Sequence, residues 1–320
     1  MNVHLTFDIE VWCNGWGNLD REFATCYPRY VYGRSKQGDY ALPKTLEILV
    51  KHGLKGVFFV EPLFSARFGQ EYLERIVRMI VDAGQEVQLH LHPEWTDEIK
   101  PPILPDTSRK RQHLTHYSFD EQVELIRYGK ALLESALGKP VTAFRAGSYA
   151  ANTDTFKALV QNGISIDSSI NGCSSISAPE LVQQYGSASP FLAHGVKTFP
   201  ISVFRDGFGR MRPAQVGACS YQEMRQAITS AQDSGWTNFV IVSHNFEMLK
   251  PGSTDPDFIV ARRFEALCRL LGENSTTLPT AGFSNPRNSS AQPPYPDQDP
   301  RSHLSSTVWR HAEQLIRRIA

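Results

Sequence analysis

Pairs of acidic and imidazole side chains stand at the ends of two apolar runs, with a spacing that suits metal ligands. Asp8 and Glu10 close the first run, and His90 and His92 close a later one. Alternate residues of a strand point to the same face, so both members of each pair point the same way. Two carboxylates facing two imidazoles offer the oxygen and nitrogen ligands of a divalent cation, with room for a water molecule. The sequence therefore predicts an open metal site at these strand ends.

Three other apolar runs also end in polar groups, which are Arg145 and Tyr149, Asp167 and Ser168, and His244. In parallel α/β architectures the functional residues gather at the C-terminal ends of the strands. A single strand-end Asp or His more often caps a loop than takes part in chemistry. Core packing, however, does not require polar ends on five of seven strands. The set as a whole indicates an active site along one rim.

Short apolar runs alternate with longer amphipathic stretches and supply the elements that position these residues. We expect seven strands, at Val3–Val11, Leu54–Val60, Glu86–His92, Thr142–Tyr149, Ile164–Ile170, Val196–Phe204 and Asn238–His244. We expect helices at Pro43–His52, Gln70–Ala83, Phe119–Leu137, Thr153–Gln161, Ser220–Ser234 and Asp257–Leu271. Ser118 and Glu121 have the form of a capping box, and Gly138 is placed to end the helix that follows them. Such repeats indicate an α/β fold with a parallel sheet or a (β/α) barrel.

Composition divides the chain into three parts. Residues 1–272 carry the alternating pattern and form the predicted catalytic domain. Residues 273–302 are rich in Asn, Ser, Thr, Pro and Gln, which bury too little surface to order a segment well, so they form a predicted linker. Residues 303–320 have the pattern of a short terminal helix, with Trp309, Leu315 and Ile319 as its apolar contacts.

The charge balance excludes several classes of protein. The 320 residues include 33 basic and 33 acidic side chains, a formal net charge of zero. Proteins that coat nucleic acid or an anionic membrane need a basic excess. No stretch approaches the roughly 20 apolar residues of a membrane span, and acidic residues interrupt the first ten positions, unlike a signal peptide. We expect a cytoplasmic protein without a nucleic-acid partner or a membrane span, and composition leaves its oligomeric state open.

The strand-end motifs resemble, in their order, those of the polysaccharide deacetylases with a NodB homology domain, carbohydrate esterase family 4. They are Thr6-Phe7-Asp8-Ile9-Glu10, Glu86 to His92 with Pro93-Glu94-Trp95, Phe144-Arg145-Ala146-Gly147-Ser148-Tyr149, Ile166-Asp167-Ser168-Ser169 and Ile241-Val242-Ser243-His244. Each motif is short, but their order and spacing over residues 1 to about 272 make the resemblance fairly specific. It implies a distorted (β/α)7 barrel and metal-assisted hydrolysis of an N-acetyl group on a sugar.

The resemblance also implies a base and a set of metal ligands. Asp8 matches the general base of the family, Glu10 its acidic metal ligand and His90 its first metal histidine. The family commonly places its second histidine four residues after the first, where this chain has Glu94, with His92 between. His92 and Glu94 are therefore alternatives for the third ligand, and imidazole is the commoner partner in zinc sites. A divalent cation, with zinc as the expected metal, is the implied cofactor.

The remaining motifs match supporting roles. Arg145 matches the arginine that orients the base, Asp167 belongs to the fifth-strand motif that supports the site, and His244 matches the general acid. A pKa near 6.5 suits His244 to protonate a departing amine. A backbone N–H near Tyr149 is placed to hold the tetrahedral oxyanion, and Tyr149 is either a substrate contact or a rim aromatic.

Two long connections, Trp12–Ala41 and Pro93–Tyr117, are expected to bind the substrate. Their aromatic side chains, with Trp12 and Trp95 foremost, can stack on sugar rings, and their arginines can recognise carboxylate or phosphate. We expect the basic run Arg109–Arg111 to be a solvated loop, with an anion site as the less favoured alternative.

The leading hypothesis is a metal-dependent hydrolase that removes N-acetyl groups from an amino-sugar-containing polysaccharide or its precursor. One alternative is another hydrolase of non-peptide C–N bonds on the same barrel, acting with or without a metal. Another is a non-catalytic carbohydrate-binding descendant. Asp8, Arg145 and His244 together weigh against that last reading, because a binding module needs no base, orienting cation and acid.

Overall fold

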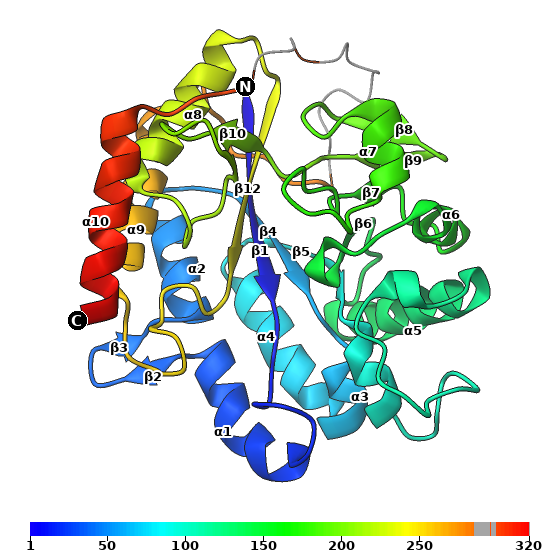
Figure 1. The fold of residues 1–320 in the computed structure, drawn as a ribbon. Coiled ribbons are helices and arrows are strands. Elements are labelled where there is room, and N and C mark those ends of the chain that lie inside the picture. The colour runs from blue at the N-terminus through cyan, green and yellow to red at the C-terminus, as the bar shows by residue number, and fades with distance from the viewer. Residues whose placement is uncertain (285–294, 296–298, 320) are drawn as a thin grey trace. The chain divides into compact units, whose positions relative to one another are not determined.

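The computed structural model describes residues 1–284, 295 and 299–319, and its elements are labelled in Figure 1. The chain forms two compact units. Unit 1 comprises residues 1–56, 202–281 and 295–320, and unit 2 comprises residues 57–201 and 282–294. Among the described residues, no helix is long and apolar enough to cross a membrane.

Unit 1 is built on two parallel strands, β1 (Asn2–Ile9) and β12 (Asn238–His244). Their register runs from Asn2 opposite Asn238 to Asp8 opposite His244, so the two predicted strand ends meet. The apolar residues of β1 and its polar residues Thr6 and Asp8 are all buried. Two short hairpins complete its strands, β2 (Arg34–Ser35) with β3 (Gly38–Asp39) and β10 (Val203–Arg205) with β11 (Met211–Pro213).

The helices of unit 1 are α1 (Leu19–Val31), α2 (Leu42–Lys51), α8 (Tyr221–Asp233), α9 (Phe258–Glu273) and α10 (Leu304–Ile319). Ser220 and Glu223 form a capping box at the start of α8, and the Asp257 carboxylate caps α9. Phe264 of α9 packs edge-on against Phe7 of β1, with ring centroids 5.8 Å apart. This packing covers the apolar face that the alternation in β1 predicts.

Unit 2 holds a sheet in the order β4-β5-β6-β7-β9-β8. Its strands are β4 (Gly56–Val60), β5 (Glu86–Leu91), β6 (Ala143–Ala146), β7 (Ile166–Asp167), β8 (Phe191–Ala193) and β9 (Val196–Thr198). Neighbouring strands from β4 to β9 are parallel, and β8 is antiparallel at the edge. The C-terminal ends of β5, β6 and β7 therefore lie side by side and carry the predicted histidines, Arg145 and Asp167.

The helices of unit 2 are α3 (Phe64–Phe68), α4 (Gln70–Asp82), α5 (Phe119–Leu137), α6 (Thr153–Gln161) and α7 (Pro179–Tyr185), with 3-10 turns η1 (Pro93–Glu98), η2 (Leu114–His116) and η3 (Gly147–Tyr149). The predicted capping box of Ser118 and Glu121 is present, and Gly138 ends α5 in the left-handed conformation. These local signals place α5 at its predicted bounds.

The seven predicted strands and six predicted helices all have counterparts, but several strands are shorter than predicted, above all β7, which spans Ile166–Asp167 in place of Ile164–Ile170. Two further differences go beyond strand length. The predicted strand Val196–Phe204 splits into β9 and β10, because Pro200 between them has no N–H to donate. The connection Trp12–Ala41, expected to be a loop, contains helix α1. Pro28 inside α1 removed a usual sequence signal of a helix, because proline is disfavoured in a helix interior.

The described parts of the predicted linker are more ordered than their composition predicts. Val3 N–H donates to Pro279 O at 2.9 Å, and Ala281 N–H donates to Val3 O at 3.0 Å. Tyr295 is buried and stacks on Trp236 with ring centroids 4.5 Å apart. Residues 285–294 and 296–298 of this predicted linker lie outside the described residues.

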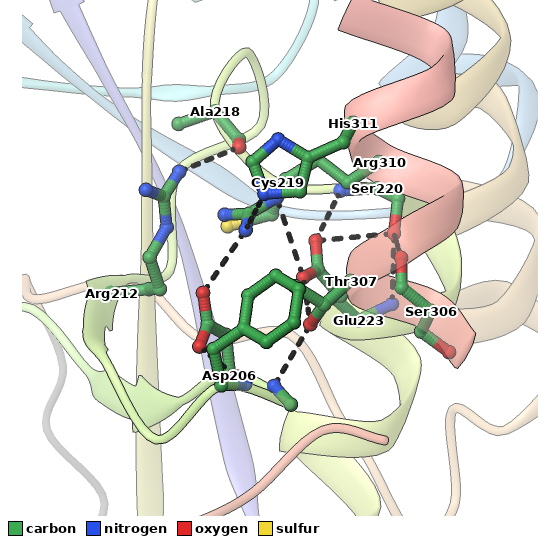
Figure 2. A network of polar contacts seen from close by, with 12 residues as sticks. Asp206, Arg212, Ala218, Cys219, Ser220, Glu223, Ser306, Thr307, Arg310 and His311 are labelled. Atoms are coloured by element: carbon green, nitrogen blue, oxygen red, sulfur yellow. Dashed lines mark hydrogen bonds and ion pairs between the residues drawn. The ribbon is translucent and has the colours of Figure 1, made fainter. Parts of the chain in front are cut away.

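Helix α10 is attached to unit 1 through a polar face, which Figure 2 shows. Arg310 is buried and donates to Asp206 Oδ2 at 3.0 Å, and its Nε lies 3.5 Å from Glu223 Oε1. Thr307 Oγ1 donates to the same Glu223 oxygen at 2.9 Å. Trp309, an expected apolar contact, is instead 57% exposed.

Leu315 is exposed as well, and the side chain of Ile319 lies outside the described residues. The expectation that apolar residues attach this helix is therefore wrong for Trp309 and Leu315. A buried arginine with its two carboxylates takes their place, together with the ion pair of Arg263 and Glu313.

Candidate active site

In unit 1 the ends of β1 and β12 bring Asp8, Glu10 and His244 into one neighbourhood. Asn245, directly after β12, locks the end of β1 through its backbone and its side chain. Its N–H donates to Asp8 O at 3.2 Å, its Oδ1 accepts from Glu10 N–H at 3.2 Å, and its Nδ2 donates to Glu10 O at 3.1 Å. Asp8 and Glu10 are both buried, so the backbone that carries two acidic side chains is rigidly held.

Trp12 contacts the Glu10 carboxylate. Its indole N–H donates to Glu10 Oε2 at 2.7 Å, a charge-assisted hydrogen bond that orients the carboxylate. The Trp12 ring packs edge-on against Trp16, with centroids 6.2 Å apart. The structure thus gives Trp12, predicted as a sugar contact, a direct part in positioning a predicted metal ligand.

His244 is held by Glu247, a residue that sequence reasoning missed. Nδ1 of His244 donates to Glu247 Oε1 at 2.9 Å, and its ring stacks against Phe246 with centroids 5.3 Å apart. The other donors to Glu247 include Gln215 Nε2, at 2.6 Å, and Gly217 N–H, at 2.5 Å. A Cβ on Gly217 would lie 2.6 Å from a Glu247 oxygen, so this approach needs glycine.

The surroundings of His244 favour its charged form. Burial lowers the pKa of His244, but the hydrogen bond to Glu247 and the negative charges of Glu10, Glu247 and Asp8 outweigh burial and raise this pKa to about 9. The imidazole is therefore protonated at neutral pH. Glu247 could have been found from the sequence, because an acid three residues after His244, in the turn after the strand, can fold back onto the imidazole.

In unit 2, His90 of β5 and His92, directly after β5, are oriented by hydrogen bonds from Nδ1. His90 Nδ1 donates to Arg145 O at 2.8 Å, and His92 Nδ1 donates to Glu94 Oε2 at 3.3 Å. A carbonyl or carboxylate can only accept, so each neutral ring carries its lone pair on Nε2, the atom that ligates a metal. The rings meet edge-on with centroids 4.8 Å apart, and both residues are buried.

Gly147, directly after β6, makes room for the ring of His92. A Cβ at this position would lie 2.7 Å from His92 Cε1 and from Nδ1, closer than real side chains approach. Only glycine fits without moving the imidazole. The next two residues, Ser148 and Tyr149, both have positive φ angles, 54° and 59°. Consecutive left-handed residues that are not glycine mark stored strain, which clusters at functional sites.

Arg145 and Asp167 are buried at the ends of β6 and β7. Arg145 Nε donates to Ser168 O at 3.0 Å, and its guanidinium lies over the ring of Phe59 at 4.3 Å. Burial raises the pKa of Asp167 to about 6, against the opposing effect of hydrogen bonds from Ser169. Unit 2 thus holds the predicted residues at or just after the ends of its own strands, namely His90, His92, Glu94, Arg145 and Asp167.

Glu61 is a second buried acid that sequence reasoning missed. Glu61 lies directly after β4, and the end of this strand was not among the predicted site positions. Burial raises the pKa of Glu61 to about 8, although backbone N–H groups of Leu63 and Phe64 donate to its carboxylate. Glu61 therefore carries a proton over much of the neutral pH range.

Two predictions concern the connection after β5: that Trp95 contacts a sugar and that the basic run Arg109–Arg111 is a solvated loop. Trp95 is 1% exposed and packs against Phe68, so it belongs to the core and offers no face to a sugar. Arg111 makes a two-bonded ion pair with Glu121, and Lys110 Nζ donates to Glu94 O and Glu98 Oε1. The Lys110 and Arg111 side chains therefore make contacts within the protein.

Tyr149, in the turn after β6, is half-buried.

Comparison with known proteins now bears on these two groups of residues. Residues 36–166 match a protein family described as polysaccharide deacetylase. A comparison with curated sequences found no match. A candidate polysaccharide deacetylase from Mycobacterium smegmatis is similar in structure, with a TM-score of 0.53 and 19% identity over 90% of this chain and 94% of that chain.

Two further solved structures are similar. A 4-alpha-glucanotransferase from Thermococcus litoralis has a TM-score of 0.51 and 13% identity, over 89% of this chain and 39% of that chain. A family 4 carbohydrate esterase from Streptomyces lividans has 15% identity over 92% of this chain and 97% of that chain, with a TM-score of 0.42. The predicted α/β fold of the NodB and polysaccharide deacetylase type is confirmed, and so is the resemblance to that family.

Proposed function

We propose, from the match of residues 36–166 to the polysaccharide deacetylases, that the protein is a metal-dependent hydrolase of N-acetyl groups on an amino-sugar polysaccharide or its precursor. The observation that carries this proposal is the hydrogen bond from His244 Nδ1 to Glu247 Oε1, 2.9 Å long, which orients and charges the imidazole. A half-buried imidazole with a pKa of about 9 is a proton donor already loaded at neutral pH, which a departing amine requires. A cytoplasmic location is part of the prediction, and cell fractionation would test it.

The orientation of His90 and His92 in unit 2 suits a divalent cation. The hydrogen bonds to Nδ1 of His90 and His92 set both rings for ligation through Nε2, which is the usual support of metal-binding histidines. We propose that Glu10 adds an oxygen ligand and that zinc is the metal. Such a cation would polarise the amide carbonyl and lower the pKa of a bound water.

Glu94 supports His92 in this proposal and is not itself a ligand. Its Oε2 accepts from His92 Nδ1, the arrangement in which a carboxylate fixes a ligand's tautomer and increases its basicity. This arrangement supports His92 as the proposed third ligand. Glu94 becomes the positioning residue.

The protein's own residues then move the protons. Asp8 takes a proton from the attacking water as the water oxygen bonds to the amide carbon, and Arg145 matches the arginine that orients this base. The C–N bond breaks, His244 gives its proton to the departing nitrogen, and the products are acetate and the free amino sugar. Glu247 stabilises the imidazolium of His244 before the transfer.

The substrate contacts follow from the strand ends. The strained turn at Ser148 and Tyr149 directs backbone N–H groups to hold the tetrahedral oxyanion, with Tyr149 as the aromatic contact. Trp12 acts by orienting Glu10, and the buried Trp95 is no longer included among the substrate contacts. Asp167 stays a supporting residue beside Arg145.

The test is acetate release from a panel of N-acetylated oligosaccharides, measured for the wild type and for Asp8→Asn. We expect acetate from at least one member of the panel and a loss of at least about 100-fold in the variant. Trp309→Ala, which changes an exposed residue of α10, is the matched control and should keep full activity. Equal release by the wild type and by Asp8→Asn would contradict the proposal.

A further inference from the structure

A pocket of about 460 Å³ opens beside His244 within unit 1. Its apolar wall includes Tyr30, Phe246 and Leu249, and Tyr30 meets Phe246 edge-on with ring centroids 5.3 Å apart. His244 itself lines the pocket, with its ring stacked on Phe246. This volume lies within the usual range for small-ligand sites, and aromatic walls suit a sugar ring.

Three basic residues from three separate segments line the same pocket. They are Arg29 from α1, Lys250 from the turn after β12, and Arg317 from α10. The guanidinium of Arg29 lies over the Tyr30 ring at 5.3 Å from its centroid. Arg317 is anchored on both sides, because its Nε donates to Asp257 at 2.5 Å and its Nη1 donates to Gly217 O at 3.2 Å.

One carboxylate, that of Glu247, faces these cations among the residues that line the pocket. Its oxygens already accept from His244, Gln215 and Gly217, and the protonated His244 balances its charge. Asp257 balances Arg317. Among the residues that line the pocket, basic side chains thus outnumber acidic ones by three to one, and a carboxylate or phosphate is the group that arginine binds best.

We infer that this pocket binds an acidic sugar residue, bearing a carboxylate or a phosphate, next to the N-acetylated sugar of the substrate. The inference rests on the proposed function, which places the N-acetylated sugar beside His244. The basic lining of the pocket is the reason to expect an acidic sugar next to it. The inference gives α10 a part in recognition, since Arg317 and the Gly217 carbonyl it holds both belong to the pocket.

The test is calorimetric binding to the full chain carrying Asp8→Asn, so that no substrate is consumed. Three disaccharides of N-acetylglucosamine serve as probes, joined to glucose, to glucuronic acid or to glucose 6-phosphate. We expect at least one acidic probe to bind about 10-fold tighter than the neutral one, and the two acidic arms tell carboxylate from phosphate. This preference should shrink as salt is raised.

Variants at the pocket assign the preference to its residues. Arg29→Gln should remove most of the gain for the acidic probe and leave the affinity for the neutral probe unchanged. Arg21→Gln, on the exposed face of the same helix and outside the pocket, is the matched control and should change neither. Equal affinity for acidic and neutral probes, no binding of either acidic probe, or equal weakening of both kinds by Arg29→Gln would overturn the inference.

Failure of the pocket and failure of the proposed function give different results. Acetate release by the wild type from neutral N-acetylated sugars, without a preference for acidic ones, would keep the deacetylase and reject the pocket. Selective binding of an acidic probe that depends on Arg29, without acetate release from any substrate, would keep the pocket and reject the deacetylase.

Discussion

The carboxylate of Glu247 accepts a hydrogen bond from Nδ1 of His244 at 2.9 Å, across the turn that follows β12. The imidazole is 22% exposed and the carboxylate 8%, so solvent weakens their attraction only slightly. Glu247 thus fixes the ring orientation, the tautomer and the charge of the proposed general acid.

Replacing Glu247 with Gln should lower the pKa of His244 from about 9 toward its ordinary value near 6.5. The folded-state pKa is raised, so the pair stabilises the wild type fully below about pH 6.5, and this stabilisation is lost as pH rises through about 9. Imidazole resonances followed by NMR in metal-free protein would measure the change. Glu273→Gln, at the end of α9, is the control, and an unchanged pKa in Glu247→Gln would contradict the assignment.

Replacing Gly147 with Ala should weaken metal binding, because the added Cβ would stand 2.7 Å from the His92 ring. The ring must turn, and the expected loss of affinity is about 10–100-fold. Zinc titration of metal-free protein by calorimetry measures it. Gly17→Ala, where a Cβ meets no atom within 4 Å, should bind zinc as the wild type does. Unchanged affinity in Gly147→Ala would show that His92 is not a ligand.

Replacing His92 and Glu94 separately should give effects of different size. If His92 is the third ligand, His92→Ala should abolish zinc binding at micromolar concentrations. Glu94→Gln removes the accepting charge 3.3 Å from His92 Nδ1 and should cost about 10–100-fold in affinity. The reverse order, with Glu94→Gln the more severe, would make Glu94 the ligand.

Replacing Arg310 with Leu should destabilise the protein by about 3–5 kcal/mol, because Asp206 and Glu223 stay buried after their cation is lost. Urea denaturation measures the free energy of unfolding. Arg225→Leu, on the exposed face of α8, should change it by less than about 0.5 kcal/mol. Similar stability of the two variants would mean that the contacts in Figure 2 do not anchor α10.

The elements that carry the site could be predicted because their signals are local. Alternation along residues 3–11 predicts Asp8 and Glu10 on one face, although β1 ends at Ile9, and the capping box at Ser118 fixes the start of α5. The same period-two pattern along residues 86–92 predicted that His90 and His92 share a face, although β5 itself ends at Leu91. None of these inferences requires knowledge of a distant contact.

The missed features depend on packing that no local pattern records. Glu247 becomes important only once the turn after β12 folds it back onto His244, with Gly217 close beside it. The attachment of α10 was misjudged because amphipathic periodicity favours apolar contacts, whereas its buried face carries Thr307 and Arg310. Trp95 was assigned to the substrate because an aromatic residue in a long connection looks exposed in sequence.

The most direct test of the central claim is acetate release before chelation, after chelation, and after zinc is restored, with metal content measured on protein purified without chelators. We predict about one zinc per chain, loss of acetate release when it is removed, and recovery when it is returned. His90→Ala protein should stay inactive after zinc is added. Acetate release undiminished by complete removal of metal would contradict the account.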